Sequence, residues 1–225
     1  MNTAIIVAGG NSTRFGQDKQ FFEIKKIPVL IRTLLAFDCA SLIDNIVVVT
    51  KEENFSSLGE LISEYEIKKP VKMVTGGDTR QRSVMNGLMA SEGSTIVAIH
   101  DGARPFVSAS DIDALVDKAG ECGAIAPAVT IPDTVIEVSG DRLLTVADRD
   151  KLRLIQTPQV FDYEKIFSAH KKAEEDGFVG TDDCSLIKYL GGEVVIAEGN
   201  PHNIKITSFE DVERAEFICE RLGEI

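Results

Sequence analysis

The sequence predicts an α/β fold, in which a mostly parallel sheet is covered by helices on both faces. Residues 4–8, 45–50 and 95–100 form short runs that are apolar at most positions, as in strands buried on both faces. Segments with helical periodicity separate these runs. Strands that alternate with helices are typical of parallel sheets, because each helix returns the chain to the starting edge of the sheet.

The first half of the chain contains five predicted strands and the helices between them. The strands cover residues 4–8, 45–50, 71–74, 95–100 and 124–129. The first helix begins near Pro28, since proline in a first turn loses no helical hydrogen bond. Two helices cover about 53–65 and 79–91. The next begins at Ser108 or Ser110, each followed three residues later by an acid, which is a variant of the capping box.

A predicted β-hairpin interrupts this alternation. Residues 134–138 and 143–146 have strand character, and a turn around Gly140 joins them. An isolated hairpin is only marginally stable in water, so it needs a packing partner from its own domain or another subunit. Helices are predicted at 163–176, from about 180 and from Ser208 to about 222, with strands at 193–197 and 203–206. We expect one domain, residues 1–225, with a protruding β-hairpin arm at about 133–149.

The composition excludes several classes of protein. A chain of 225 residues with 44% hydrophobic residues can bury a sizeable core, and no apolar run approaches the roughly 18 residues of a membrane span. The four cysteines are scattered without a CxxC pair, so neither a zinc site nor a disulfide framework is expected. Because no signal-type segment is visible, we expect a soluble, cytoplasmic protein that does not associate with membranes.

The charge pattern points to a small anionic ligand. The net charge of -12 argues against nucleic-acid binding, which needs a basic face. A few cations that converge on one pocket can nevertheless bind a small anion. Loops 9–19, 76–80 and 101–104 each follow a predicted strand and carry both glycine and charge. Ligands of parallel α/β sheets bind at the carboxyl ends of the strands, so these loops predict a shared binding site.

The first of these loops combines Gly9 and Gly10 with two cations, Arg14 and Lys19. Glycine lets backbone N–H groups approach a ligand, and the cations indicate that this ligand is an anion, with phosphate as the first candidate. The loop matches neither the P-loop pattern GxxxxGK[ST] nor the dinucleotide pattern GxGxxG.

The loop does resemble the signature of Rossmann-like nucleotidyltransferases, GG-x-S-x-R-x-G-x(2)-K. The matching residues are Gly9, Gly10, Ser12, Arg14, Gly16 and Lys19. In that superfamily the loop wraps the triphosphate of the incoming nucleotide, and the resemblance implies a Rossmann-like fold and the same use here. Sugar-phosphate, cytidylyl and molybdenum-cofactor guanylyl transferases all carry such a loop, so it does not choose a substrate.

Further motifs narrow the resemblance to one family. In chain order they are 76–84 (GGDTRQRSV), 100–106 (HDGARPF), Asp148-Arg149, 156–159 (QTPQ), 181–183 (TDD) and 203–207 (NIKIT). This set resembles the 2-C-methyl-D-erythritol 4-phosphate cytidylyltransferases of the non-mevalonate isoprenoid pathway over nearly the whole chain. The resemblance implies a reaction of CTP with 2-C-methyl-D-erythritol 4-phosphate that gives 4-diphosphocytidyl-2-C-methyl-D-erythritol and pyrophosphate.

The resemblance also implies a role for each matching residue. The catalytic residues would be Arg14, Lys19 and Lys205. CTP would be bound by Ala8, Gly9, Gly10, Ser12, Gly77, Asp78, Ser83 and Asp101. The polyol phosphate would be held by Arg104, Arg149, Thr157 and Thr181. Mg²⁺ or another divalent cation would bridge phosphate oxygens, with Asp101 as its protein ligand.

Such a reaction needs no general base. Its nucleophile is a phosphomonoester oxygen, which is largely dianionic at pH 7 because the second pKa is about 6. The sequence shows no Ser-His-Asp or Cys-His arrangement, and His100 is expected to orient its loop rather than to take part in the chemistry. Catalysis then consists of charge neutralisation and in-line positioning.

Two other functions stay open at this point. One is ribitol-5-phosphate cytidylyltransferase, which shares the fold, CTP and the reaction; the other is an inactive nucleotide-binding regulatory domain. Leu152 after Asp148-Arg149, together with the TDD motif, favours the methylerythritol enzyme, and the intact cations argue against the inactive domain. The chain departs from the family's usual pattern at Asp18, where proline is common, and at residues 8–12, where AAGxG is common.

The arm predicts a homodimer with shared sites. Its apolar residues are Val135, Ile136, Val138, Leu143, Leu144 and Val146. This is more apolar surface than a solvated ribbon should expose, and packing against the same arm of a second subunit would bury it with two-fold symmetry. Arg149 lies just past the arm, so the pairing would carry it toward the neighbour's polyol-phosphate site, as the family resemblance also implies.

Overall fold

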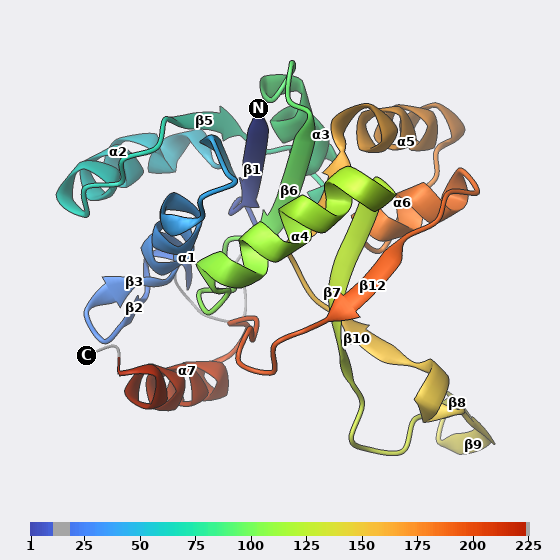
Figure 1. Ribbon diagram of the computed structural model, residues 1–225. Helices are drawn as coiled ribbons and strands as arrows, with labels where there is room; N and C mark the ends of the chain where they lie inside the picture. Colours follow the sequence, from blue (N-terminus) through green and yellow to red (C-terminus); the bar gives the residue numbers. More distant parts are fainter. Residues whose placement is uncertain (11–18, 224–225) are drawn as a thin grey trace.

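The computed structural model describes residues 1–10 and 19–223, and within them an eight-stranded sheet forms the centre (Figure 1). Its order is β10-β7-β11-β6-β1-β4-β5, with β12 paired to β7. The strands are β1 (Asn2–Val7), β4 (Asn45–Thr50), β5 (Val71–Thr75), β6 (Ile96–Asp101), β7 (Ala124–Thr130), β10 (Arg153–Ile155), β11 (Gln159–Asp162) and β12 (Val195–Glu198). Neighbours among β1, β4, β5 and β6 pair in parallel, which confirms the predicted α/β class with a mostly parallel sheet.

Helices cover both faces of this sheet (Figure 1). They are α1 (Val29–Cys39), α2 (Phe55–Glu64), α3 (Arg80–Ala90), α4 (Ala109–Cys122), α5 (Tyr163–Asp176), α6 (Asp183–Tyr189) and α7 (Phe209–Leu222). Alternate residues of β1 point to opposite faces, so Ala4 and Ile6 pack beneath α1 and α4, whereas Ile5 packs beneath α3. None of the helices in the described ranges is long and apolar enough to cross a membrane.

Two strands of the sheet were not among those predicted. β11 runs antiparallel between β6 and β7, and β10 runs antiparallel beside β7. Both are short, of four and three residues, and β11 directly follows Pro158, so the sequence offers no extended strand pattern there. The pair of two-residue strands β2 (Glu23–Ile24) and β3 (Ile27–Pro28) was missed for the same reason.

The prediction of a strand at residues 203–206 is wrong. This segment is a loop whose Ile206 N–H donates to the carbonyl oxygen of Ala103, at 2.8 Å, and it forms no ladder with a neighbouring strand. Ile204 and Ile206 are instead buried in a small core with α7. The apolar alternation that suggested a strand therefore serves to anchor the loop, and it brings Lys205 to the end of β6.

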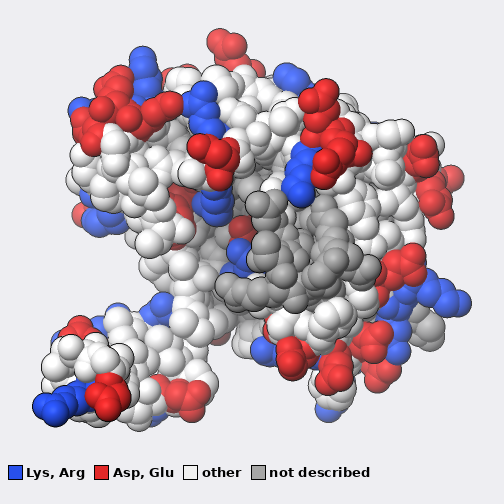
Figure 2. Space-filling view, turned by 180° about the vertical axis from the view of Figure 1, so that it is seen from behind, with Lys and Arg blue, Asp and Glu red and all other residues white. Residues whose placement is uncertain are grey.

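The predicted β-hairpin forms an arm that stands clear of the rest of the chain (Figures 1 and 2). It consists of β8 (Ile136–Ser139) and β9 (Arg142–Val146), joined through Gly140, whose φ of +59° lies in the left-handed region. The arm exposes apolar side chains to solvent, between 43% exposed for Ile136 and 62% for Leu144. Within one chain the arm therefore leaves most of its apolar surface in contact with solvent.

Candidate active site

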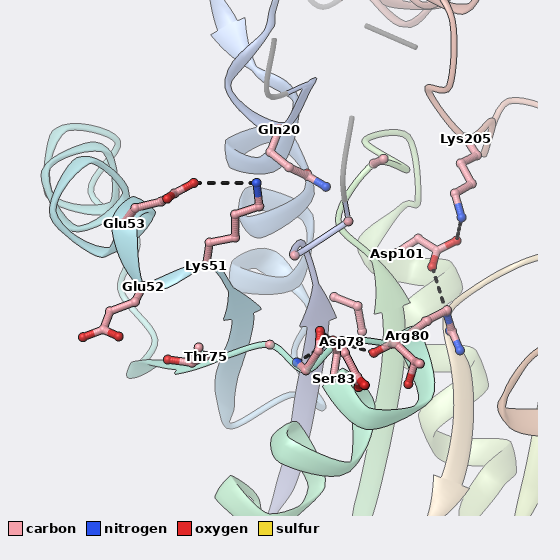
Figure 3. Close-up of a pocket in the computed structure, with 17 residues that line it drawn as sticks. Gln20, Lys51, Glu52, Glu53, Thr75, Asp78, Arg80, Ser83, Asp101 and Lys205 are labelled. Atoms are coloured by element: carbon pink, nitrogen blue, oxygen red, sulfur yellow. Dashed lines mark hydrogen bonds and ion pairs between the residues drawn. The ribbon is translucent and has the colours of Figure 1, made fainter. Parts of the chain in front are cut away.

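A cleft lined by charged side chains lies at the carboxyl ends of β1, β4, β5 and β6, which is the edge of the sheet where the topology predicts a ligand site. The cleft has a volume of about 500 Å³. Backbone and side chains from four loops line it: Gly9 and Gly10 after β1, residues 51–53 after β4, residues 75–79 after β5, and Asp101 and Ala103 at the end of β6. Lys205 from the loop before α7 completes the wall (Figure 3).

The Asp101 carboxylate forms ion pairs with three cations. Its Oδ2 lies 2.8 Å from the Nζ of Lys205 and 3.5 Å from the Nε of Arg104. Its Oδ1 lies 3.6 Å from the Nε of Arg80 (Figure 3). Burial alone would raise the pKa of Asp101, but Lys205, Arg80 and Arg104 outweigh it and hold the pKa well below its usual range. The cleft therefore presents an ionised carboxylate in contact with three cations, and cations that converge on one point can bind a polyanion.

Arg80 is held between two carboxylates, because it opens α3 at the edge of the cleft. In addition to Asp101, its Nη2 contacts the Oδ2 of Asp183 at 2.8 Å. Burial would lower the pKa of Arg80, but Asp183 and Asp101 outweigh it and raise the pKa. Asp183 is 1% exposed, and its Oδ1 lies 3.0 Å from the Nε2 of His170. Arg80 thus connects the cleft with the buried pair formed by Asp183 of α6 and His170 of α5.

A chain of hydrogen bonds fixes the loop that follows β6. The carbonyl oxygen of Arg104 can only accept, so the Nε2 of His100, 3.0 Å away, carries the ring proton. Burial lowers the pKa of His100 to about 4, so the ring is neutral and its Nδ1 accepts from the Thr157 hydroxyl at 3.0 Å. The Oγ1 of Thr157 in turn accepts from the Asp101 N–H at 3.1 Å. His100 orients this loop, as expected, and makes no contact with the cleft.

The loop after β5 forms a narrow turn against the start of α3. The N–H of Gly77 donates to the Oγ of Ser83 at 3.0 Å, and Ser83 donates to the carbonyl oxygen of Thr79 at 2.9 Å. A Cβ at Gly77 would lie 2.3 Å from the Cγ of Arg82, so only glycine fits here without moving the helix. Gly77, Asp78 and Ser83 all line the cleft, as the sequence predicts.

The structure brings most of the predicted site residues together. Those that line the cleft are Gly9, Gly10, Gly77, Asp78, Ser83, Asp101 and Lys205. Ala8 is buried beneath the cleft, and its N–H donates to the carbonyl oxygen of Val49 at 2.7 Å. Arg104 and Thr157 contact Asp101 without lining the cleft themselves. Ser12 and Arg14 lie outside the described residues, as does the side chain of Lys19, whose backbone begins a 3-10 turn (Lys19–Phe21).

Four predicted substrate-binding residues do not line the cleft within one chain: Arg104 and Thr157, which contact Asp101, and Arg149 and Thr181. Arg149 lies at the base of the arm, where its Nη1 donates to the carbonyl oxygen of Pro132 at 2.7 Å. Thr181 is exposed, just before the Asp182 that caps α6. Neither is among the residues that line the cleft.

Several residues that build the site were not singled out from the sequence. Arg80 belongs to the charged loop 76–80, but the sequence predicts no individual role for it. Asn203 is buried; its carbonyl oxygen accepts from the Nη1 of Arg104 at 2.8 Å, and its amide donates to the Thr157 carbonyl group. Lys51 and Glu53, an ion pair at 3.6 Å, also line the cleft, without any motif to mark them. Arg80 and Asn203 both belong to matched motifs, which is the signal that could have found them.

Asp101 also fits a divalent cation. Within residues 1–10 and 19–223 no group of three His, Cys, Asp or Glu side chains could form a metal cage. Mg²⁺ usually binds through one or two carboxylates and the phosphates of a substrate, and it keeps several waters. One permanently ionised carboxylate at the edge of a cleft meets that requirement.

The fold and the cleft together define a Rossmann-like α/β protein with a site for a polyanionic ligand at the carboxyl edge of its sheet. A profile of the family described as IspD: 2-C-methyl-D-erythritol 4-phosphate cytidylyltransferase matches residues 2–221. The chain therefore belongs to the 2-C-methyl-D-erythritol 4-phosphate cytidylyltransferase family of nucleotidyltransferases.

Individual relatives agree with this membership. The 2-C-methyl-D-erythritol 4-phosphate cytidylyltransferase of Geobacillus thermodenitrificans is 42% identical and covers 98% of both chains. That of Halalkalibacterium halodurans is 41% identical, with 96% of both chains covered. Among solved structures, the 4-diphosphocytidyl-2C-methyl-D-erythritol synthase of Anaerococcus prevotii has a TM-score of 0.88, 29% identity, and coverage of 97% of this chain and 96% of its own.

Proposed function

We propose that the protein transfers a cytidylyl group from CTP to 2-C-methyl-D-erythritol 4-phosphate, releasing pyrophosphate, for isoprenoid precursor synthesis. Family membership supports this reaction. The observation that carries the proposal is the carboxylate of Asp101, which contacts Lys205, Arg80 and Arg104 at the edge of the cleft. A site of this charge suits a reaction in which one anion attacks another.

The chemistry follows from charge neutralisation. The 4-phosphate oxygen attacks the α-phosphorus of CTP, a P–O bond forms, and the bond to the leaving pyrophosphate breaks. The attacking phosphate is largely dianionic at pH 7, so no proton has to be removed. Lys205, with Arg14 and Lys19, would neutralise the charge that develops at the α-phosphorus. Such electrostatic stabilisation of the transition state is usually the largest single contribution to catalysis.

The second substrate would bind close to Asp101, at the side chains of Arg104 and Thr157 that contact it. Arg104 is held there by Asp101 and by the carbonyl oxygen of Asn203, which supports a role in holding the polyol phosphate. Thr157 approaches the same point through its bond to the Asp101 N–H, and Thr181 is proposed to contact the polyol from α6. Mg²⁺ or another divalent cation, held by Asp101, would neutralise phosphate charge when bound.

The test is a pyrophosphate-release assay with CTP and 2-C-methyl-D-erythritol 4-phosphate. We expect pyrophosphate to appear only when both substrates are present, in an amount equal to the cytidylylated product. Binding of CTP without release from either polyol phosphate would indicate the inactive regulatory domain and would contradict the proposal.

The base should be selected by the narrow turn after β5. Backbone groups of Gly77 and Asp78 can match the hydrogen-bonding edge of cytosine and leave a purine unpaired or clashing. An unpaired buried polar group costs about 1–3 kcal/mol, so CTP should be preferred over ATP and GTP by at least about tenfold in kcat/KM. Initial rates with each nucleotide measure this preference, and comparable rates with GTP would point to guanylyl transfer instead.

We also propose that the arm is a dimerisation element. The exposed apolar side chains of β8 and β9 support a two-fold pairing with a second copy, and Arg149 at the base of the arm is proposed to serve the polyol-phosphate site of the neighbour. A cytoplasmic location is a further proposal, supported by the scattered cysteines, all free in the structure.

A further inference from the structure

A row of ion pairs runs from the cleft into the body of the protein. It begins at Lys205 and Asp101, continues through Arg80, and ends at Asp183, whose other carboxylate oxygen contacts His170. These side chains come from the loop before α7, β6, α3, α6 and α5, so the row crosses most of one half of the fold. The last two members are 1% exposed and do not reach the cleft.

We propose that Asp183 is a positioning residue for the transfer reaction, acting through Arg80 on the Asp101 carboxylate. This inference rests on the proposed function, because it concerns the residues that would meet the reacting phosphates. Asp183 holds the guanidinium of Arg80 at a set distance from Asp101, so that the carboxylate stays paired with Lys205.

The distances from Arg80 to its two carboxylate partners support this role of Asp183. The contact of Arg80 with Asp183 is 2.8 Å, whereas its contact with Asp101 is 3.6 Å. Arg80 is therefore bound mainly to Asp183. Without the charge of Asp183, Asp101 would be the carboxylate still paired with Arg80, and the guanidinium would move toward it. Arg80 would then compete with Lys205 for the same carboxylate, and Lys205 would lose its fixed position.

The backbone around Asp183 is built to hold this side chain still. The Oε1 of Gln159 accepts from the N–H groups of Asp183 and Cys184, both at 3.1 Å, and the Nε2 of Gln159 donates to Asp182 at 2.7 Å. His170 holds the other carboxylate oxygen of Asp183. A functional group whose own supports are fixed in this way is preorganised. A buried ion pair adds little net stability over apolar replacements, so its value here lies in geometry.

The first experiment is Asp183→Asn, which keeps the shape of the side chain and removes its charge. Because a misplaced Lys205 acts at the reacting phosphate, kcat should fall by about tenfold or more, while the Kd for CTP measured by calorimetry changes less than about threefold. The control is Glu174→Gln, which removes the exposed pair of Glu174 with Arg82 between α5 and α3, and should leave both values unchanged. Unchanged kcat in Asp183→Asn overturns the proposal.

A second experiment covers the case in which Asp183→Asn folds poorly because it leaves Arg80 without its buried partner. Arg80→Met is compared with the double variant Arg80→Met/Asp183→Asn, in which neither partner of the ion pair is left buried alone. If Asp183 acts through Arg80, the second substitution should not lower kcat further. A further fall of about tenfold would mean that Asp183 acts by another route, which contradicts the proposal.

A spectroscopic measurement separates this proposal from the proposed function. The Nη–H signals of Arg80 in a nitrogen-15 spectrum are assigned by their loss in Arg80→Lys. Because Nη2 contacts Asp183, its protons should exchange slowly in the parent protein and rapidly in Asp183→Asn. An unchanged exchange rate overturns the positioning role, whether or not the parent protein releases pyrophosphate.

Discussion

Arg14→Ala and Lys19→Ala should each lower turnover by more than roughly tenfold, because the proposed mechanism uses both cations to neutralise the charge that develops in the transition state. The loop that carries them follows Gly10, which lines the cleft. Initial rates of pyrophosphate release at saturating CTP and polyol phosphate measure the effect. Far-ultraviolet circular dichroism should be unchanged, since apolar side chains of the described residues form the two cores that hold the sheet and its helices together.

The matched control for these variants is Lys171→Ala. Lys171 is exposed on α5 and is not among the residues that line the cleft, so its loss changes the total charge without changing the charge of the site. Turnover in Lys171→Ala should equal that of the parent protein. Near-parental turnover in either Arg14→Ala or Lys19→Ala, with an intact spectrum, would remove that residue from the proposed mechanism.

Mixing two inactive variants should restore activity if the sites are shared between subunits. In a mixed dimer of Arg149→Ala and Lys19→Ala, a residue acting across the interface leaves one site with both defects and one with neither. Up to about one quarter of the parental activity should then return, since half the dimers are mixed after random exchange and each has one intact site. The structure supports this design, because Arg149 lies at the base of the arm and does not line the cleft of its own chain.

Subunit exchange must be shown independently, by mass spectrometry of differently labelled subunits. If exchange is complete and no activity returns, then Arg149 acts within its own subunit or the arm does not cross to its neighbour. Sedimentation at micromolar concentration supplies the second check: a monomer would refute both the dimer and the role proposed for the arm.

The parallel core could be predicted because its strands are buried on both faces. β1, β4 and β6 appear in the sequence as apolar runs, and the order strand, helix, strand fixes their direction. The arm could be predicted because its apolar residues surround a glycine turn. β10 and β11 could not, since three or four residues carry too little periodicity, and their pairing with β7 depends on contacts distant in the chain.

The site was predictable where a loop follows a predicted strand and less so elsewhere. Asp101 stands at the end of β6, so the topology alone assigns it to the ligand edge. The partnership of Arg80 with Asp183 was not predictable, because the two residues are about a hundred positions apart and meet only through the packing of α3 beside α5 and α6. The segment at Lys205 was assigned the wrong secondary structure, yet its place in the site was predicted from its motif.

The central claim concerns which polyol phosphate the protein cytidylylates, and a competition experiment tests it most directly. Equal concentrations of 2-C-methyl-D-erythritol 4-phosphate and ribitol 5-phosphate are supplied with limiting CTP and Mg²⁺, and the products are identified by mass spectrometry. We predict that 4-diphosphocytidyl-2-C-methyl-D-erythritol forms in large excess. Predominant formation of CDP-ribitol, or consumption of CTP without either product, would contradict the account.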